Sequence, residues 1–293
     1  MLNFNRTGTE IASTNLIISG IFFLPKIRLM DKKVAIVGGG NLGVAISEGL
    51  LVSAFIKPES LVVTKRNTAT IKHLEEMGVE ITSDNIAAVS KCDVIILAIK
   101  PFQVREVLQG IKQELTAGKI LISVVTGVTL DEMSEVLEHD VPLFRAMPNT
   151  AIAIRESMTC ICSSNGNKVD TEYVERLFST LGKVVTIEEK LMEAATILGA
   201  CGTAYAMRYI RANIQGGIEI GFDAATASLI AAQTVKGAAD LLLQKGNHPE
   251  QEIDKVTTPK GCTIAGLNEM EHRGFSSSLI RGIIASYKKI ERN

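Results

Sequence analysis

The sequence predicts an α/β chain in which a doubly wound parallel sheet is followed by an all-α carboxyl-terminal domain. Short β-branched runs alternate with helical stretches from residue 30 onward. Such alternation favours parallel pairing with helical crossovers. A glycine-rich turn joins the first strand to the first helix, and the strands stop at about residue 188. We therefore expect two domains, residues 30–187 and 188–293, each long enough to have its own core.

The individual elements follow from the apolar pattern. The predicted strands are short apolar runs, most of them rich in Val and Ile, at residues 33–38, 60–65, 93–99, 119–125, 141–147, 158–164 and 183–187. Helical stretches lie between the early strands, at residues 41–53, 68–78 and 101–115. Three longer helical stretches follow, at residues 189–221, 223–246 and 263–290.

The three late helical stretches are rich in alanine and have little polar face. Helices that are apolar on more than one side need more partner surface than one short domain supplies. An intertwined homo-oligomer satisfies this need. The alternative is a compact monomeric helical cap.

Residues 1–29 form a predicted amino-terminal extension, disordered or loosely attached. The apolar run LIISGIFFLP is too short to span a bilayer, and no small-residue cleavage motif follows it cleanly. Met30 opens the stretch MDKKVAIVGGG as a protein start would. An extension is therefore favoured over a signal peptide.

The composition indicates which kinds of partner and which cellular compartment to expect. The net charge is −1 and aromatic residues make up 4% of the chain, so we expect no nucleic-acid partner and no membrane surface. Cys160 and Cys162 are the one close pair among five cysteines, and no second pair or nearby histidine completes a metal site. We expect no metal, and reduced thiols in a cytoplasmic protein.

Gly38, Gly40 and Gly43 form a G-x-G-x-x-G motif after the first strand, with Asn41 and Leu42 inside it. In a Rossmann-type fold the first glycine permits the tight turn, the second lets the backbone approach a pyrophosphate, and the third allows close helix–strand contact. The helix amino terminus adds unpaired N–H groups and partial positive charge. The motif predicts dinucleotide binding. The alternative is a glycine turn that only packs.

The end of the second strand indicates which dinucleotide binds. Thr64, Lys65, Arg66 and Asn67 stand where an NAD site usually has an acid for the ribose 2′-hydroxyl. A lysine or arginine binds a 2′-phosphate that a carboxylate would repel. NADP(H) is therefore favoured over NAD(H), and the alternative is a solvated basic turn. Lys100, after the strand at 93–99, either lies near the cofactor or caps its strand in solvent.

The residues that indicate the hydride acceptor must be sought in the second half of the chain. The sequence contains no G-x-S-x-G and no H-E-x-x-H, and its four histidines stand in polar contexts. Carbonyl reduction usually needs a proton donor. A protonated cyclic imine is already an electrophile and mainly needs positioning. The sequence therefore favours an acceptor with modest catalytic demands.

One stretch, DKVTTPKGCTIAGLNEME at residues 254–271, can position such an acceptor. A turn at Pro259 and Gly261 leads into a helix that begins at Cys262 or Thr263. The backbone N–H groups at that start would hold a carboxylate, and the hydroxyls of Thr258 and Thr263 would hydrogen-bond the substrate. The alternative is an ordinary helix in which a threonine caps its own backbone.

These stretches resemble the pyrroline-5-carboxylate reductases, over nearly all of residues 30–290. The resemblance includes the glycine turn, DVIILAIKP, TGVTLDEM, RAMPNTA, GFDAATASLIAAQTVKGAADLLL and, most specifically, TTPKGCTIAGLNEME. It implies NAD(P)H-dependent hydride transfer to the C=N carbon of 1-pyrroline-5-carboxylate, which gives L-proline in the last step of proline biosynthesis. It also implies dimers formed through the helical domain and often assembled into decamers.

The resemblance assigns residue roles as well. Thr263 would hydrogen-bond the imine nitrogen, and the amides of Gly261, Cys262 and Thr263 would bind the carboxylate. The cofactor site would be lined by Asn85, Ala98, Lys100 and Pro101.

Two positions depart from the family pattern. Lys260 stands where the family usually has a glycine or another small residue, and the stretch Gly199–Ala204 replaces Ser-Gly-Ser-Gly-Pro-Ala. A side chain at 260 could reshape the carboxylate pocket or add a charge to it. Two alternatives therefore stay open: a reductase of another small imine or keto acid, and a non-catalytic NADP-binding oligomer.

Overall fold

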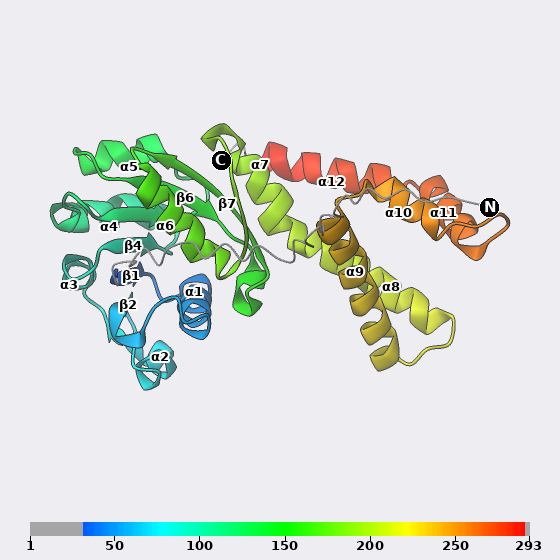
Figure 1. The fold of residues 1–293 in the computed structure, drawn as a ribbon, viewed down its shortest axis with the longest axis horizontal. Helices are drawn as coiled ribbons and strands as arrows, with labels where there is room; N and C mark the ends of the chain where they lie inside the picture. Colours follow the sequence, from blue (N-terminus) through cyan, green and yellow to red (C-terminus); the bar gives the residue numbers. More distant parts are fainter. Residues whose placement is uncertain (1–31, 291–293) are drawn as a thin grey trace, which may run out of the picture. The chain divides into compact units, whose positions relative to one another are not determined.

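The computed structural model describes residues 32–290 (Figure 1). The predicted extension at residues 1–29 lies outside the described residues. The strands are β1 (Val34–Val37), β2 (Leu61–Thr64), β3 (Glu80–Thr82), β4 (Val94–Leu97), β5 (Ile120–Ser123), β6 (Leu143–Met147), β7 (Ser157–Ser164) and β8 (Gly182–Thr186). The helices of the first part are α1 (Asn41–Val52), α2 (Lys72–Glu76), α3 (Asn85–Ser90), α4 (Val104–Ile111), α5 (Leu130–Leu137) and α6 (Lys168–Ser179). The later helices are α7 (Met192–Ala195), α8 (Gly202–Glu219), α9 (Ala224–Lys245), α10 (Pro249–Lys255), α11 (Cys262–His272) and α12 (Phe275–Ile290).

The described strands form one sheet in the order β3-β2-β1-β4-β5-β6-β7-β8. Strands β1 to β6 run parallel to one another. Because β1 pairs with both β2 and β4, the strand order reverses between β1 and β4. This is the topological switch point of a doubly wound sheet, where ligands bind outside the carboxyl ends of the strands. The predicted Rossmann-type sheet followed by helices is confirmed.

The sheet differs from the prediction at two places. The sequence predicts no strand at β3, because its three residues are half-buried or exposed and form no apolar run. The prediction of parallel pairing is wrong for one pair, since β7 runs antiparallel to β6. The last strand, β8, pairs parallel with β7. The connection from β6 to β7 contains a short 3₁₀ turn, Thr150–Ile154, and no crossover helix. An antiparallel partner needs no crossover.

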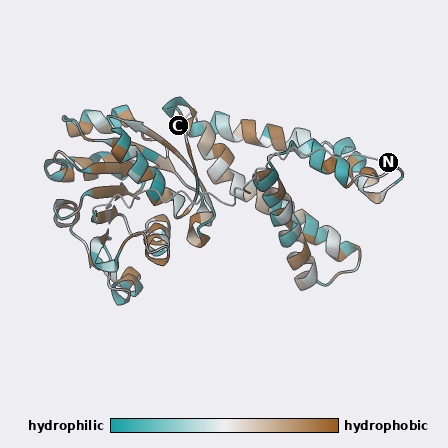
Figure 2. Cartoon of the chain, viewed as in Figure 1, coloured by the Kyte–Doolittle hydropathy of each residue, from teal (hydrophilic) through white to brown (hydrophobic). Residues whose placement is uncertain are grey.

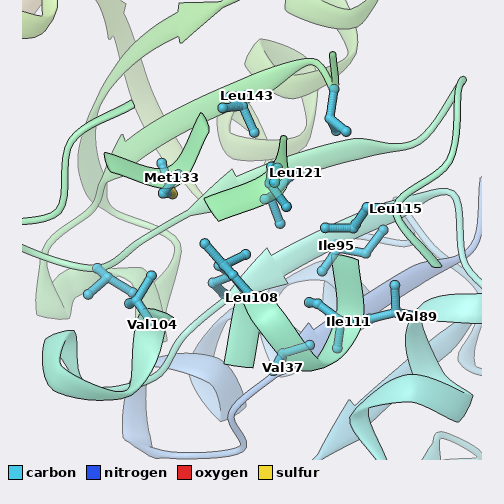
Figure 3. Packing of buried hydrophobic residues seen from close by; sticks show 14 of the residues in the cluster. Val37, Val89, Ile95, Val104, Leu108, Ile111, Leu115, Leu121, Met133 and Leu143 are labelled. Carbon is cyan, nitrogen blue, oxygen red and sulfur yellow. The ribbon is translucent and has the colours of Figure 1, made fainter. Parts of the chain in front are cut away.

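Burial explains why the central strands were predictable. Every residue of β1, β2, β4 and β5 is buried, and strands covered on both faces form continuous apolar runs. On α4, Val104, Leu108 and Ile111 share one helical face and are at most 3% exposed. Figure 3 shows this face in one cluster with Ile95 and Leu121 of the sheet.

The carboxyl-terminal helices expose much of their apolar surface. Within the described residues, α8, α10, α11 and α12 have no buried position, and α9 buries Ala227 and Ala231. Leu229 and Leu243 are 71% and 72% exposed, and hydrophobic segments are visible along α8, α9 and α12 in Figure 2. Such surface requires a partner. The pattern favours the predicted oligomer over a compact monomeric cap.

Two helical stretches are interrupted. The stretch predicted at 263–290 is two helices, separated at Gly274, whose φ is +79°. The stretch predicted at 189–221 contains a π-helical segment, Thr196–Cys201, between α7 and α8. Within residues 32–290, no helix has the length and apolarity needed to cross a bilayer.

Candidate active site

A pocket of about 870 Å³ lies at the carboxyl ends of β1, β2 and β4. Its walls come from the segments that follow these strands, at the switch point of the sheet. It brings together most of the predicted cofactor residues: Gly38, Gly40, Asn41, Leu42, Lys65, Arg66, Asn85, Ala98 and Lys100. Gly43 and Pro101 do not line it.

The three glycines of the turn have different surroundings. A Cβ on Gly38 would lie 2.4 Å from the Ala98 carbonyl oxygen, and the φ of Gly38 is +114°. A Cβ on Gly43 would lie 2.1 Å from the Gly38 carbonyl oxygen, so this glycine serves packing of α1 on the turn. A Cβ on Gly40 would meet nothing within 4 Å. Packing thus explains two glycines, while the open side of Gly40 leaves its backbone accessible to a ligand.

The glycine turn is tied to the end of β2. The N–H groups of Gly38 and Gly39 donate to the Thr64 carbonyl oxygen at 3.2 and 2.7 Å. The buried Thr64 hydroxyl donates to the Asn85 side-chain oxygen at 2.6 Å. This bond occupies the Asn85 side-chain oxygen, and Asn85 itself lines the pocket. Lys65 and Arg66 follow directly, so two cations stand at this end of the pocket.

Lys100 lines the pocket rather than lying apart from it. Its backbone N–H donates to the Gln103 side-chain oxygen at 3.3 Å. Gln103, Glu106 and Val107, at the start of α4, complete this wall. The sequence does not predict these three residues as part of the site, although a helix that begins after a central strand must start at the ligand-binding end of the sheet.

The turn at residues 258–263 lies elsewhere in the chain, and its predicted substrate residues do not line the nucleotide pocket. Gly261 is the N-cap of α11, and no side chain of the described residues caps this helix. The alternative of a threonine that caps its own backbone is therefore not what is found. The Gly261 N–H already donates to the Thr258 carbonyl oxygen at 2.9 Å. Cys262 and Thr263 are the first two residues of α11, where backbone N–H groups have no partner within the helix.

Lys260 adopts a φ of +61° in this turn. That region favours glycine, which fits the family pattern at this position. The Lys260 side chain is exposed, so the departure adds a cation beside the start of α11.

The cysteines carry no sign of redox or metal chemistry. All five lie within the described residues and are free. Burial raises the pKa of the Cys162 thiol to about 11, which makes it a poor nucleophile near neutral pH. Within residues 32–290, no group of three or more His, Cys, Asp or Glu side chains could hold a metal ion.

Two family models match the two parts of the chain. Residues 189–293 match a model described as pyrroline-5-carboxylate reductase dimerisation, and residues 33–127 match one described as NADP oxidoreductase, coenzyme F420-dependent. Pyrroline-5-carboxylate reductase 2 of Dictyostelium discoideum is 45% identical over 279 residues, which cover 90% of this chain and 93% of that relative. The chain belongs to the pyrroline-5-carboxylate reductase family. Its carboxyl-terminal helices are therefore a dimerisation domain, and the predicted homo-oligomer is confirmed at that level.

Further members of the family agree with this assignment. Pyrroline-5-carboxylate reductase 1 of Dictyostelium discoideum is 47% identical over 275 residues, which cover 90% of this chain but 50% of that relative's length. The crystal structure of Plasmodium falciparum pyrroline carboxylate reductase with NADP bound matches with a TM-score of 0.80 and 28% identity, over 89% of this chain and 97% of that chain. The family resemblance drawn from the sequence is confirmed.

Proposed function

We propose that this chain reduces 1-pyrroline-5-carboxylate to L-proline with NADPH. The observation that carries the proposal is the 45% identity to a pyrroline-5-carboxylate reductase over nearly the whole of both chains. The pocket at the switch point supports the cofactor half of the reaction, and the uncapped start of α11 supports the substrate half.

In the cofactor half, the turn at Gly38–Gly43 and the amino terminus of α1 hold the pyrophosphate. Gly40 allows the close approach, since no atom lies within 4 Å of its missing Cβ. Lys65 and Arg66 bind the 2′-phosphate, which a carboxylate at the same place would repel. The cofactor is therefore NADP(H) rather than NAD(H). Asn85, held by Thr64, donates its amide N–H groups to the adenosine half.

In the substrate half, the N–H groups of Cys262 and Thr263 hold the carboxylate, helped by the partial positive charge of the α11 amino terminus. The Thr263 hydroxyl accepts a hydrogen bond from the protonated imine nitrogen, and Thr258 borders the same turn. NADPH, when bound, supplies the hydride that forms the new C–H bond. The electron pair of the C=N π bond moves to nitrogen, so the product is a secondary amine and the reduced cofactor becomes NADP⁺. No general acid is needed, because the imine enters protonated.

We also propose an oligomeric state and a cellular location for this chain. The dimer brings the α11 turn to a nucleotide pocket that its residues do not line within one chain. Dimers assemble further into a decamer, as the family resemblance implies. A cytoplasmic location is supported by the five free cysteines, since reducing compartments keep thiols unpaired.

The test is an activity assay on the purified chain with NADPH and pyrroline-5-carboxylate. We expect loss of the reduced cofactor's absorbance and appearance of proline. Measurable NADPH binding with no turnover would contradict the proposal. It would favour another small imine or keto acid, which parallel assays with such acceptors can identify, or a non-catalytic oligomer.

Thr263→Ala tests the substrate half, with Thr257→Ala as the matched control. The Thr257 hydroxyl donates to the Ile253 carbonyl oxygen at 2.8 Å and so serves α10. We expect turnover to fall roughly 10-fold or more in Thr263→Ala, the effect of one lost hydrogen bond to a charged group, with NADPH affinity unchanged. Equal turnover in Thr263→Ala and wild type would remove Thr263 from the site.

A further inference from the structure

A fully buried arginine lies on an inner strand of the sheet and is not used by the proposed chemistry. Arg145, on β6, is 2% exposed. Its two terminal nitrogens donate to Glu189 at 3.0 Å and to Glu193 at 2.9 Å. Both carboxylates are themselves more than two-thirds buried. These three residues are called the Arg145 cluster below.

The Arg145 cluster joins three segments of the chain. Arg145 stands two residues before the end of β6, and Glu189 and Glu193 stand at the start of the carboxyl-terminal helices. The same Glu189 oxygen also accepts the N–H of Leu130 at 2.7 Å, at the first residue of α5. The Arg145 guanidinium therefore links β6 to α7 through Glu193, and it is linked to α5 through Glu189.

The segments beyond this cluster meet again at the carboxyl edge of the sheet. β6 continues into Asn149, and α7 continues directly into the π-helical segment Thr196–Cys201. The Asn149 side-chain nitrogen donates to the Gly199 carbonyl oxygen at 3.4 Å. π-Helical segments occur frequently at functional sites. The Arg145 cluster thus sets how this segment sits against the turn that follows β6.

The direction of the dinucleotide places the reaction at this edge. In the proposed function the pyrophosphate binds at the turn after β1, and the adenosine half lies beside β2, where Lys65 and Arg66 line the pocket. In the strand order β2-β1-β4-β5-β6, the nicotinamide half must extend the other way, over β4 toward β6. The turn at Asn149 and the π-helical segment therefore border the reacting end.

Stability alone does not account for the Arg145 cluster. Buried ion pairs are often no more stable than well-packed apolar residues of similar volume, but removal of one partner is costly. Arg145 Nε and Glu193 Oε2 are buried and make no hydrogen bond within the described residues. Two buried polar atoms without a hydrogen bond lower the stability of the fold. The Arg145 cluster is therefore better explained by the fixed position that it gives to its three segments.

We propose that Arg145, acting through Glu193, is a positioning residue for hydride transfer, because it holds the π-helical segment Thr196–Cys201 against the Asn149 turn. The inference rests on the proposed function for its kinetic readout. A displacement of about 1 Å at a reacting centre can cost roughly 100-fold in rate. Loss of the ion pair between Arg145 and Glu193 should therefore lower kcat and leave NADPH binding unchanged.

The experiment compares Glu193→Gln, Arg145→Met and Arg145→Lys with the wild-type oligomer. Each is measured for kcat, for the dissociation constant of NADPH and for amide hydrogen exchange of residues 196–201. We expect kcat to fall roughly 10- to 100-fold in Arg145→Met, less in Arg145→Lys and in Glu193→Gln, with NADPH affinity within about twofold of wild type. Exchange at residues 196–201 should become faster in the same order.

Lys119→Met is the matched control for a merely structural loss. The Lys119 ammonium donates to the carbonyl oxygens of Val89, Ser90 and Cys92 at 2.7, 3.1 and 2.6 Å. These residues precede β4 and β5, at the amino ends of the central strands. Lys119→Met should lower the thermal midpoint without changing kcat. Wild-type kcat in Glu193→Gln would overturn the inference, and so would a fall in kcat in Lys119→Met equal to that in Glu193→Gln. If Arg145→Met does not fold, the kcat of Glu193→Gln alone tests the inference.

The exchange measurement separates this inference from the proposed function. If the wild type binds NADPH but has no turnover, the proposed function fails. Faster exchange at residues 196–201 in Glu193→Gln would then still support the role of the Arg145 cluster in holding that segment. Unchanged exchange would overturn it.

Discussion

Two glycines of one turn should respond in opposite ways to the same added methyl group. In Gly43→Ala the new Cβ lies 2.1 Å from the Gly38 carbonyl oxygen and 3.2 Å from the Ile36 side chain. Relief requires α1 to move until the first distance reaches at least 3.4 Å, an ordinary contact. In Gly40→Ala the new Cβ meets nothing within 4 Å, and the φ of −80° suits alanine.

The sizes of the two effects follow from these contacts. Overpacking against backbone costs about 3 kcal/mol, the upper end of the usual range, which lowers the thermal midpoint of a chain of this size by roughly 6–12 °C. Gly40→Ala replaces a tolerated N-cap by a poorer one and costs about 1 kcal/mol or less. Its methyl occupies the open side of the turn, where we propose that the pyrophosphate binds. Loss of one hydrogen bond to that charged group, about 1.5–3 kcal/mol, weakens NADPH binding roughly 10- to 150-fold.

The assays are thermal unfolding without nucleotide, at one fixed protein concentration because the chain is an oligomer, and NADPH titration well below the midpoint. Gly43→Ala should lose stability, and Gly40→Ala should lose affinity while its midpoint stays within a few degrees of wild type. A Gly40→Ala variant that binds NADPH as tightly as wild type would refute the pyrophosphate assignment. A Gly43→Ala variant of unchanged stability would refute the packing argument.

Two further predictions concern the cofactor preference and the buried thiols. Arg66→Ala should raise the dissociation constant of NADPH roughly 10-fold, the effect of one lost phosphate contact, and leave that of NADH unchanged; equal effects on both nucleotides would make Arg66 a solvated charge. Burial raises the pKa of Cys162 from its ordinary value of 9.0 to about 11. Between these pH values the unfolded chain has released a proton that the fold retains, so the contribution of this thiol to the free energy of unfolding falls as the pH rises from 9.0 to about 11. Denaturant unfolding below pH 9.0 and near pH 11 should therefore show a larger loss for wild type than for Cys162→Ala, and equal losses would contradict the assignment.

The sequence predicts best where one local cause decides the structure. The central strands are covered on both faces, so each is a continuous apolar run, and the glycine spacing marks the turn after β1. The direction of β7 was missed because it depends on a short connection rather than on any property of the strand itself. The sequence does not predict that Gln103 and Glu106 line the pocket, because helical periodicity shows which face of a helix is buried and not which end of it meets a ligand.

The Arg145 cluster cannot be predicted from local sequence patterns, because its residues are far apart in the chain. Arg145 is separated from Glu189 by 44 residues and from Glu193 by 48. No spacing in the sequence marks such a pair, and only the fold brings the charges together. The turn at Thr263 is predicted as a substrate site from the family resemblance, and the geometry of one chain leaves it outside the nucleotide pocket.

The central claim is that this chain transfers hydride from NADPH to the imine carbon of pyrroline-5-carboxylate. NADPH that carries deuterium at the transferred position of its nicotinamide tests this claim most directly. Mass spectrometry and NMR of the product should show proline with one deuterium on the former imine carbon. Oxidation of the cofactor without deuterium in proline, or no oxidation despite bound NADPH, would contradict it.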